Sequence, residues 1–168
     1  MTDGYGYGYA TGIRVKGDVY YVWWYQTEEG EDRVETVDGE VLVFTSREEC
    51  LAWASSEGRP QGAEEDPEYP ILDCDVLQSW LDRKSTVLDH SLALDVLNMS
   101  IDVDKSLGGT WEPRRGHGDV VYRVLFAASV PWVFDLDSYV PRWSAHDVNL
   151  ARQILGRCVG VLNAALSR

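Results

Sequence analysis

Three groups of side chains in this sequence could do chemistry: paired aspartates, histidines with cysteines, and a short basic segment. Of three Asp-x-Asp pairs, Asp102/Asp104 is the most suggestive, because Ser106 continues the alternation of a calcium-binding loop. The pattern then fails, since Leu107 stands where such a loop needs glycine and Pro113 where it needs glutamate. The histidines lack ligand spacing and the cysteines form no Cys-x-x-Cys pair. We therefore expect no metal site and no cofactor.

The basic segment consists of Arg114, Arg115 and His117 in a glycine-containing loop. Two arginines could clamp a carboxylate or a phosphate. A solvated loop tip, or pairing with acidic residues of the same chain, would explain them equally well. The chain has no Gly-x-Ser-x-Gly elbow, phosphate loop or dinucleotide fingerprint. We expect no catalytic activity, and an enzyme or small-molecule-binding protein that uses the Arg114/Arg115 loop is kept as an alternative.

The charge of the chain is concentrated in one window. Between Glu28 and Asp75 there are sixteen acidic and three basic residues, so the window accounts for the whole formal net charge of −13. Such a one-sided field repels nucleic acid and anionic membranes and attracts a basic partner. A solvated face, or carboxylates that discourage pairing at a sheet edge, would also explain it. We favour a binding surface that recognises a basic protein, with no nucleic acid and no membrane as partner.

Length and composition indicate a single domain over residues 1–168, with ordinary hydrophobic and charged fractions of 45% and 26%. An acidic connector rich in proline and glycine, residues 58–70, could divide it into two subdomains. Three widely separated cysteines argue against a disulfide framework and for a reducing compartment. Without a signal-like segment or a long apolar run, we expect a cytoplasmic protein.

Strands are expected in the first third of the chain. Residues 3–9 alternate glycine and tyrosine, which would place the tyrosines on one face of an extended segment; an aromatic binding strip is the less favoured interpretation. Residues 19–25 are rich in β-forming types, and residues 33–37 and 40–44 flank Asp38-Gly39, the dipeptide of a type I′ hairpin. These three segments predict an antiparallel three-stranded meander.

Helices are expected over residues 47–57, from Asp73 onwards, over 88–99 and over 144–167, the first and last with capping pairs at Ser46/Glu49 and Ser144/Asp147. Residues 120–128 predict a strand, and residues 131–134 a further short one. The fold class is therefore α+β: an antiparallel sheet that starts with a three-stranded meander and packs against about four helices, including a long C-terminal helix.

Small, acidic α+β proteins with many aromatic residues and no catalytic motif resemble the immunity proteins that protect bacteria from their own polymorphic toxins. Here the resemblance rests on composition, on the acidic window, and on the Val-Tyr-Tyr-Val-Trp-Trp strand followed by an Asp-Gly hairpin and a capped helix. It implies a non-catalytic inhibitor that binds and neutralises a basic toxin, often a nuclease. A cytosolic secretion chaperone or adaptor is the alternative, which dimerisation with a peptide-binding groove would favour.

The expected partner-binding surface combines aromatic anchors with an acidic rim. The anchors are Trp23, Trp24 and Tyr25, and the acidic residues are Glu28, Glu29, Glu31, Asp32, Glu35, Asp38, Glu40, Glu64, Glu65, Asp66 and Glu68.

Overall fold

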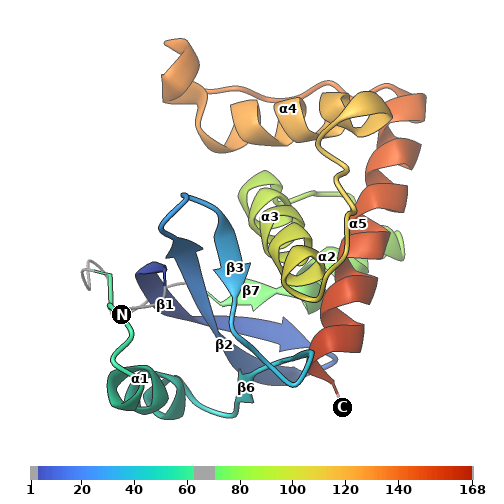
Figure 1. The fold of residues 1–168 in the computed structure, drawn as a ribbon. Helices are drawn as coiled ribbons and strands as arrows, with labels where there is room; N and C mark the ends of the chain where they lie inside the picture. Colours follow the sequence, from blue (N-terminus) through green and yellow to red (C-terminus); the bar gives the residue numbers. More distant parts are fainter. Residues whose placement is uncertain (1–3, 63–70, 168) are drawn as a thin grey trace.

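The computed structural model describes residues 4–62 and 71–167, and it confirms the α+β fold class (Figure 1). The strands are β1 (Tyr5–Val15), β2 (Asp18–Thr27), β3 (Asp32–Val34), β4 (Thr36–Val37), β5 (Glu40–Val41), β6 (Val43–Phe44) and β7 (Leu72–Asp73). The α-helices are α1 (Arg47–Ser56), α2 (Cys74–Leu81), α3 (His90–Ser106), α4 (Asp119–Ser129) and α5 (Ala145–Leu166). Two 3-10 helices complete the described elements, η1 (Gly116–Gly118) and η2 (Pro131–Phe134).

The sheet has the order β3-β2-β1-β7, and β6 also pairs with β2. Its three-stranded antiparallel meander is β1-β2-β3, so it begins one strand earlier than the sequence predicts. The strands expected over residues 33–37 and 40–44 are both broken: β3 and β6 pair with different parts of β2, and β4 and β5 form a separate hairpin between them. Asp38 and Gly39 have φ values of 54° and 79°, which confirms the predicted hairpin turn. The short β7 joins β1 in parallel.

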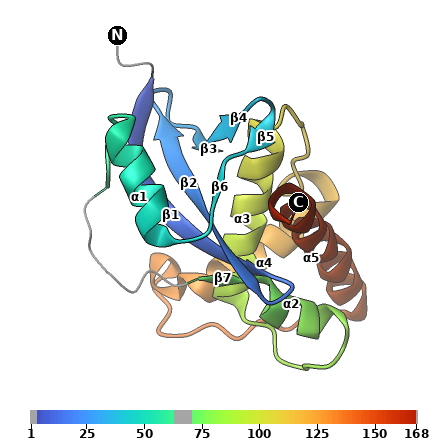
Figure 2. The same cartoon turned by 90° about the horizontal axis from the view of Figure 1, so that it is seen from below.

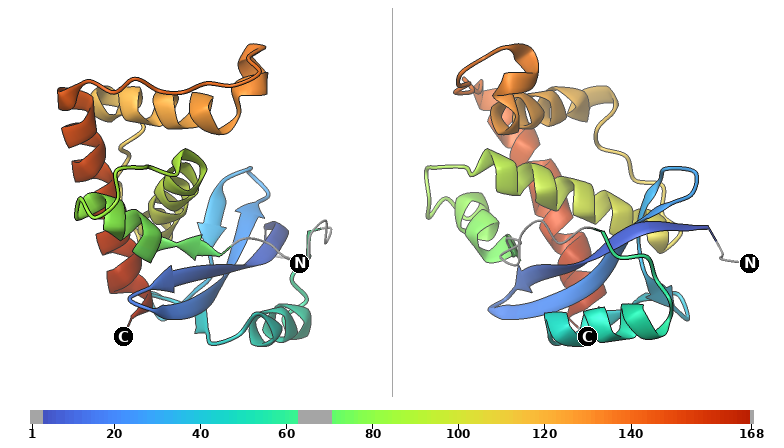
Figure 3. Two further views of the ribbon diagram at one scale, coloured as in Figure 1. Left: turned by 180° about the vertical axis from the view of Figure 1, so that it is seen from behind. Right: turned by 90° about the vertical axis from the view of Figure 1, so that its left-hand side faces the viewer.

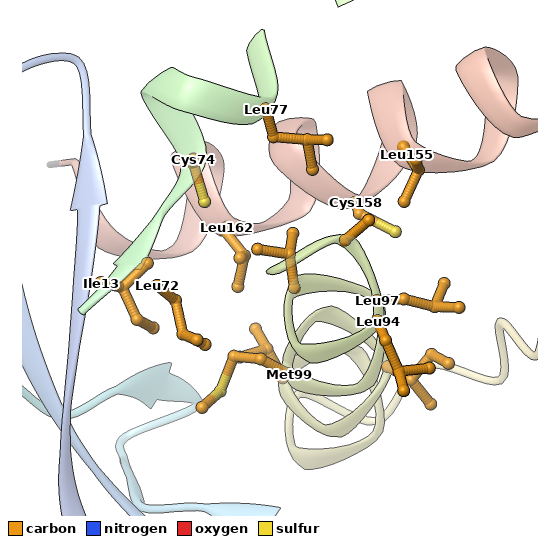
Figure 4. Close-up of a cluster of buried hydrophobic side chains, with 14 of the residues drawn as sticks. Ile13, Leu72, Cys74, Leu77, Leu94, Leu97, Met99, Leu155, Cys158 and Leu162 are labelled. Atoms are coloured by element: carbon orange, nitrogen blue, oxygen red, sulfur yellow. The ribbon is translucent and has the colours of Figure 1, made fainter. Parts of the chain in front are cut away.

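Helices cover both faces of the sheet. In Figure 2, α1 lies on one side of β1 and β2, and α3 and α5 lie on the other. The main core fills the α3–α5 side with side chains from β1, β7, α2, α3 and α5 (Figure 4). A smaller cluster beneath α1 consists of Ala10, Trp23, Cys50 and Ala54, with partly buried aromatic rings around it. The sheet therefore separates two cores of unequal size.

Local capping explains where the helices begin. The Ser46 hydroxyl accepts a hydrogen bond from the Glu49 N–H, and Asp73 accepts from two N–H groups at the start of α2. Ser144 accepts from the Asp147 N–H at the start of α5. Each bond satisfies a donor that the first turn of a helix leaves free. The helices predicted from these caps are confirmed, and α3 extends seven residues beyond its predicted end, from Met99 to Ser106.

The two strands predicted in the last third are wrong. Residues 119–129 form helix α4, because Val121 and Leu125 are buried one helical turn apart and Asp119 pairs with Arg123 at i, i+4. The β-forming residue types in this run fit a helix with one buried stripe equally well. Residues 131–134 form η2 instead of a strand. Figure 3 shows α4 and the segment that connects it to α5 at one end of the molecule.

Candidate functional site

Most of the described carboxylates that were predicted to bind a partner lie along the β3 side of the sheet. The β2–β3 turn carries Glu28, Glu29 and Glu31, and β3 begins with Asp32. The β4–β5 hairpin follows and carries Asp38 and Glu40. All six residues are exposed, and we call this set the acidic edge. The remaining predicted acids, Glu64, Glu65, Asp66 and Glu68, lie outside the described residues.

Two predicted partner contacts are corrected by burial. Trp23 is 1% exposed and belongs to the core beneath α1, so its ring cannot anchor a partner. It packs over Gly8, where an added Cβ atom would lie 2.6 Å from the indole ring. Glu35 is 8% exposed and pairs with Arg59, its Oε1 lying 3.1 Å from Nη2. Burial raises the pKa of Glu35, and the charge of Arg59 opposes that shift.

Arg59 sits in a clamp made of aromatic rings and one carboxylate. Its guanidinium carbon lies 3.4 Å from the centroid of the Tyr5 ring and 5.6 Å from that of Trp53. The Glu35 carboxylate supplies the opposite charge, and the side chains of both partners are largely buried. Tyr25 also contacts this group, because the centroid of its ring lies 5.0 Å from the centroid of the Tyr5 ring. Cation–π attraction and a charged hydrogen bond thus hold one cation between rings and an acid.

A pocket of about 270 Å³ opens beside the acidic edge. We call it the aromatic pocket; its lining residues are Tyr7, Tyr9, Trp24, Tyr25, Gln26 and Asp32. Tyr7 and Tyr9 are 68% and 45% exposed, and Trp24 is half-buried. The three tyrosines of residues 5–9 do not share one face as the alternation predicts. An irregularity in the β1–β2 register between Tyr5 and Gly8 separates Tyr5, which meets Arg59, from Tyr7 and Tyr9, which line the pocket.

Trp24 connects the pocket to α3. Its Nε1–H donates to Oδ2 of Asp102 at 3.1 Å, and Val34 N–H in the next strand donates to the Ser106 hydroxyl at 3.0 Å. Burial raises the pKa of Asp102 to about 7, and the nearby charge of Asp32 adds to the effect. The bond from Trp24 and the charges of Arg114 and Lys105 oppose this rise. The pocket therefore has a carboxylate at its mouth and a second one behind Trp24.

The Arg114/Arg115 loop does not present two cooperating arginines. Nε and Nη2 of Arg114 both donate to the Glu112 carboxylate, each at 2.7 Å, so the guanidinium fork is engaged within the loop. Arg115 and His117 are exposed. The pairing within the chain, which the sequence left open, accounts for Arg114. An anion-binding role for this loop would require Arg114 to leave Glu112.

The Asp102/Asp104 pair lies within α3, so it cannot form a calcium-binding loop. Asp104 instead accepts the N–H of Trp111 at 3.0 Å, which ties the following loop to the helix. Within residues 4–62 and 71–167, no three His, Cys, Asp or Glu side chains come together to hold a metal ion. In the same part of the chain, no helix has the length and apolar character needed to cross a membrane.

Comparison with known proteins gives no further guide: no protein-family model, curated protein or solved structure matches this chain. Four contributors to the site, Tyr7, Tyr9, Gln26 and Asp102, were not among the predicted partner contacts. The glycine–tyrosine alternation of residues 3–9 was the signal for the first two. Asp102 gave none, because only the fold brings it to Trp24.

Proposed function

We propose that this protein is a non-catalytic, immunity-type inhibitor that binds and neutralises a basic toxin through the acidic edge and the aromatic pocket. The observation that carries the proposal is the group of exposed carboxylates on the β2–β3 turn and at the start of β3, where Asp32 also lines the aromatic pocket. Asp38 and Glu40 continue the acidic edge on the β4–β5 hairpin that follows. Opposite charge accelerates encounter and rejects wrong partners, while a few desolvated aromatic contacts supply the slow dissociation. Trp24, Tyr7 and Tyr9 replace Trp23 as the anchors in this proposal.

The partner should be a basic protein whose toxic activity is lost in the complex. The tagged protein would be used to capture it from the native host, and the captured partner would then be expressed with and without this protein. Protection of the expressing cells and a one-to-one complex are the expected results. A captured partner that is acidic, or whose toxicity is unaffected, would refute the proposal.

The role of the acidic edge is tested by the rate of association. Glu28→Lys, Glu29→Lys and Glu40→Lys together should slow association with the partner by about 10-fold or more at low salt, with little change in dissociation. The matched control reverses three exposed acids elsewhere: Asp18→Lys, Glu57→Lys and Asp137→Lys. Both triple variants change the net charge equally, so the control should slow association by less than about 3-fold. Equal losses would show that overall charge matters and the edge does not.

A further inference from the structure

The aromatic pocket is lined by groups that favour positive charge. Among the described residues, six line it; they supply aromatic rings, one carboxylate and one amide, and none of them is basic. Ring faces carry negative potential, and Asp32 adds a full negative charge at the same mouth. Gln26 Nε2 lies 3.5 Å from Asp32 Oδ1, which is too far for a strong bond. This set of groups favours a cation with a flat or apolar body.

Two bases beside the acidic edge, Arg33 and Lys105, are already paired with Glu31. Nη2 of Arg33 lies 2.5 Å from Glu31 Oε2, and Nζ of Lys105 lies 3.6 Å from Glu31 Oε1. Both cations are therefore paired with Glu31, the residue before Asp32 in the sequence. The neighbouring Glu28 and Glu29 add further negative charge on the exposed turn. The field at the pocket mouth attracts a cation that comes from outside the chain.

The molecule itself shows what such a set of groups can hold. On the α1 side of the same strands, Tyr5, Trp53 and Glu35 enclose the guanidinium of Arg59. The pocket repeats that combination with Tyr7, Tyr9 and Trp24 as rings and Asp32 as the acid. A planar guanidinium suits it better than an ammonium, because it can stack on a ring and meet a carboxylate with two N–H groups.

We propose that the aromatic pocket binds the side chain of an arginine, with the guanidinium stacked against the aromatic rings and paired with Asp32. This inference rests on the proposed function, since it names the residue type by which the basic partner is recognised. The volume of about 270 Å³ is sufficient for one such side chain. The acidic edge then guides the partner, and the pocket holds one arginine of it.

The test uses the whole protein and small probes, so it does not depend on knowing the partner. The ¹⁵N-labelled protein is titrated with Nα-acetyl-arginine amide, and the Trp24 indole N–H resonance is followed. We expect saturable shifts at Trp24, Tyr7 and Tyr9 with a Kd on the order of millimolar, as befits a single side chain. Nα-acetyl-citrulline amide has nearly the same shape without the charge, and it should bind at least about 5-fold more weakly. Equal binding of citrulline, or tighter binding of the lysine analogue, overturns the proposal.

Two pairs of variants locate the binding. Asp32→Asn should weaken arginine binding about 5- to 10-fold, whereas Glu28→Gln, which removes the same charge from the exposed turn, should weaken it less than 2-fold. Tyr7→Leu should weaken it about 2- to 5-fold, whereas Tyr139→Leu, at an exposed tyrosine outside the pocket lining, should leave it unchanged. Equal effects within each pair would overturn the assignment to the pocket. If no arginine probe binds but the charge-reversed edge still slows the partner, this inference fails and the proposed function stands.

Discussion

Asp102 offers the sharpest test of the structure, because its carboxylate is buried beneath the sheet at 7% exposure. Burial, followed by the charge of Asp32, raises its pKa to about 7 from the ordinary 3.8. The unfolded chain therefore releases this proton near pH 4, while the folded protein keeps it until about pH 7. Across that window the unfolded state binds fewer protons, so this group makes folding stability fall as the pH rises.

The magnitude follows from the two pKa values. Each pH unit within the window lowers the free energy of unfolding by about 1.4 kcal/mol, so the loss between pH 5 and pH 8 is about 2–3 kcal/mol. Asp102→Asn removes the titration and keeps an oxygen that can accept the Trp24 Nε1–H. Relative to wild type, the variant should therefore gain about 2–3 kcal/mol between these two pH values.

Urea unfolding followed by tryptophan fluorescence measures the difference at pH 5 and at pH 8. Asp38→Asn is the control, since it removes one carboxylate from the exposed β4–β5 turn. An Asp102→Asn effect that is the same at both pH values would refute the reasoning. It would mean that water or a partner solvates the Asp102 carboxylate despite its burial.

Three further predictions concern the cores. Leu162→Ala should lower the free energy of unfolding by about 2–5 kcal/mol, because Leu162 is fully buried. Arg157→Ala should lower it by about 0.5–1 kcal/mol, since it removes only the stacking of the Arg157 guanidinium on the Trp111 ring, whose centroid lies 4.5 Å away. Burial raises the pKa of all three thiols, those of Cys50, Cys74 and Cys158, to about 12. Labelling of the native thiols should therefore be slow, and it should become complete only in denaturant. Helix α1 covers the smaller core, and its amide protons should exchange at lower free energy than those of α3 and α5 in hydrogen-exchange mass spectrometry. Rapid labelling of the native thiols, or equal protection of the three helices, would contradict the last two expectations.

Local signals in the sequence predicted those parts of the fold that depend on neighbouring residues. The caps at Ser46 and Ser144 and the turn at Asp38-Gly39 each involve groups within a few residues, so pattern alone locates them. Residues 119–129 were mistaken for a strand because β-forming types also fit a helix when its neighbours bury only one stripe. Tertiary contacts, which the pattern does not record, decide between the two.

The site was predictable in its charge but not in its geometry. The acidic window is visible in the sequence, yet the burial of Glu35 depends on its pairing with Arg59, which lies on the far side of α1 in the chain, and Glu28 stays exposed. The same holds for neighbouring tryptophans: strand alternation sends Trp23 to the α1 side and Trp24 towards α3. Which of them is buried depends on Gly8 and Asp102, which are distant in the sequence.

The place of α5 in the core has a consequence for synthesis of the protein. It is the last described element to leave the ribosome, yet it supplies six buried residues to the main core and packs along α3. Until α5 has been translated, those parts of α2 and α3 that pack against it have no cover, and the emerging chain exposes them to water. Such surfaces attract chaperones and invite aggregation. We therefore expect the main core to form only after translation of α5, and the rate at which this last segment is made to influence how much protein reaches the folded state.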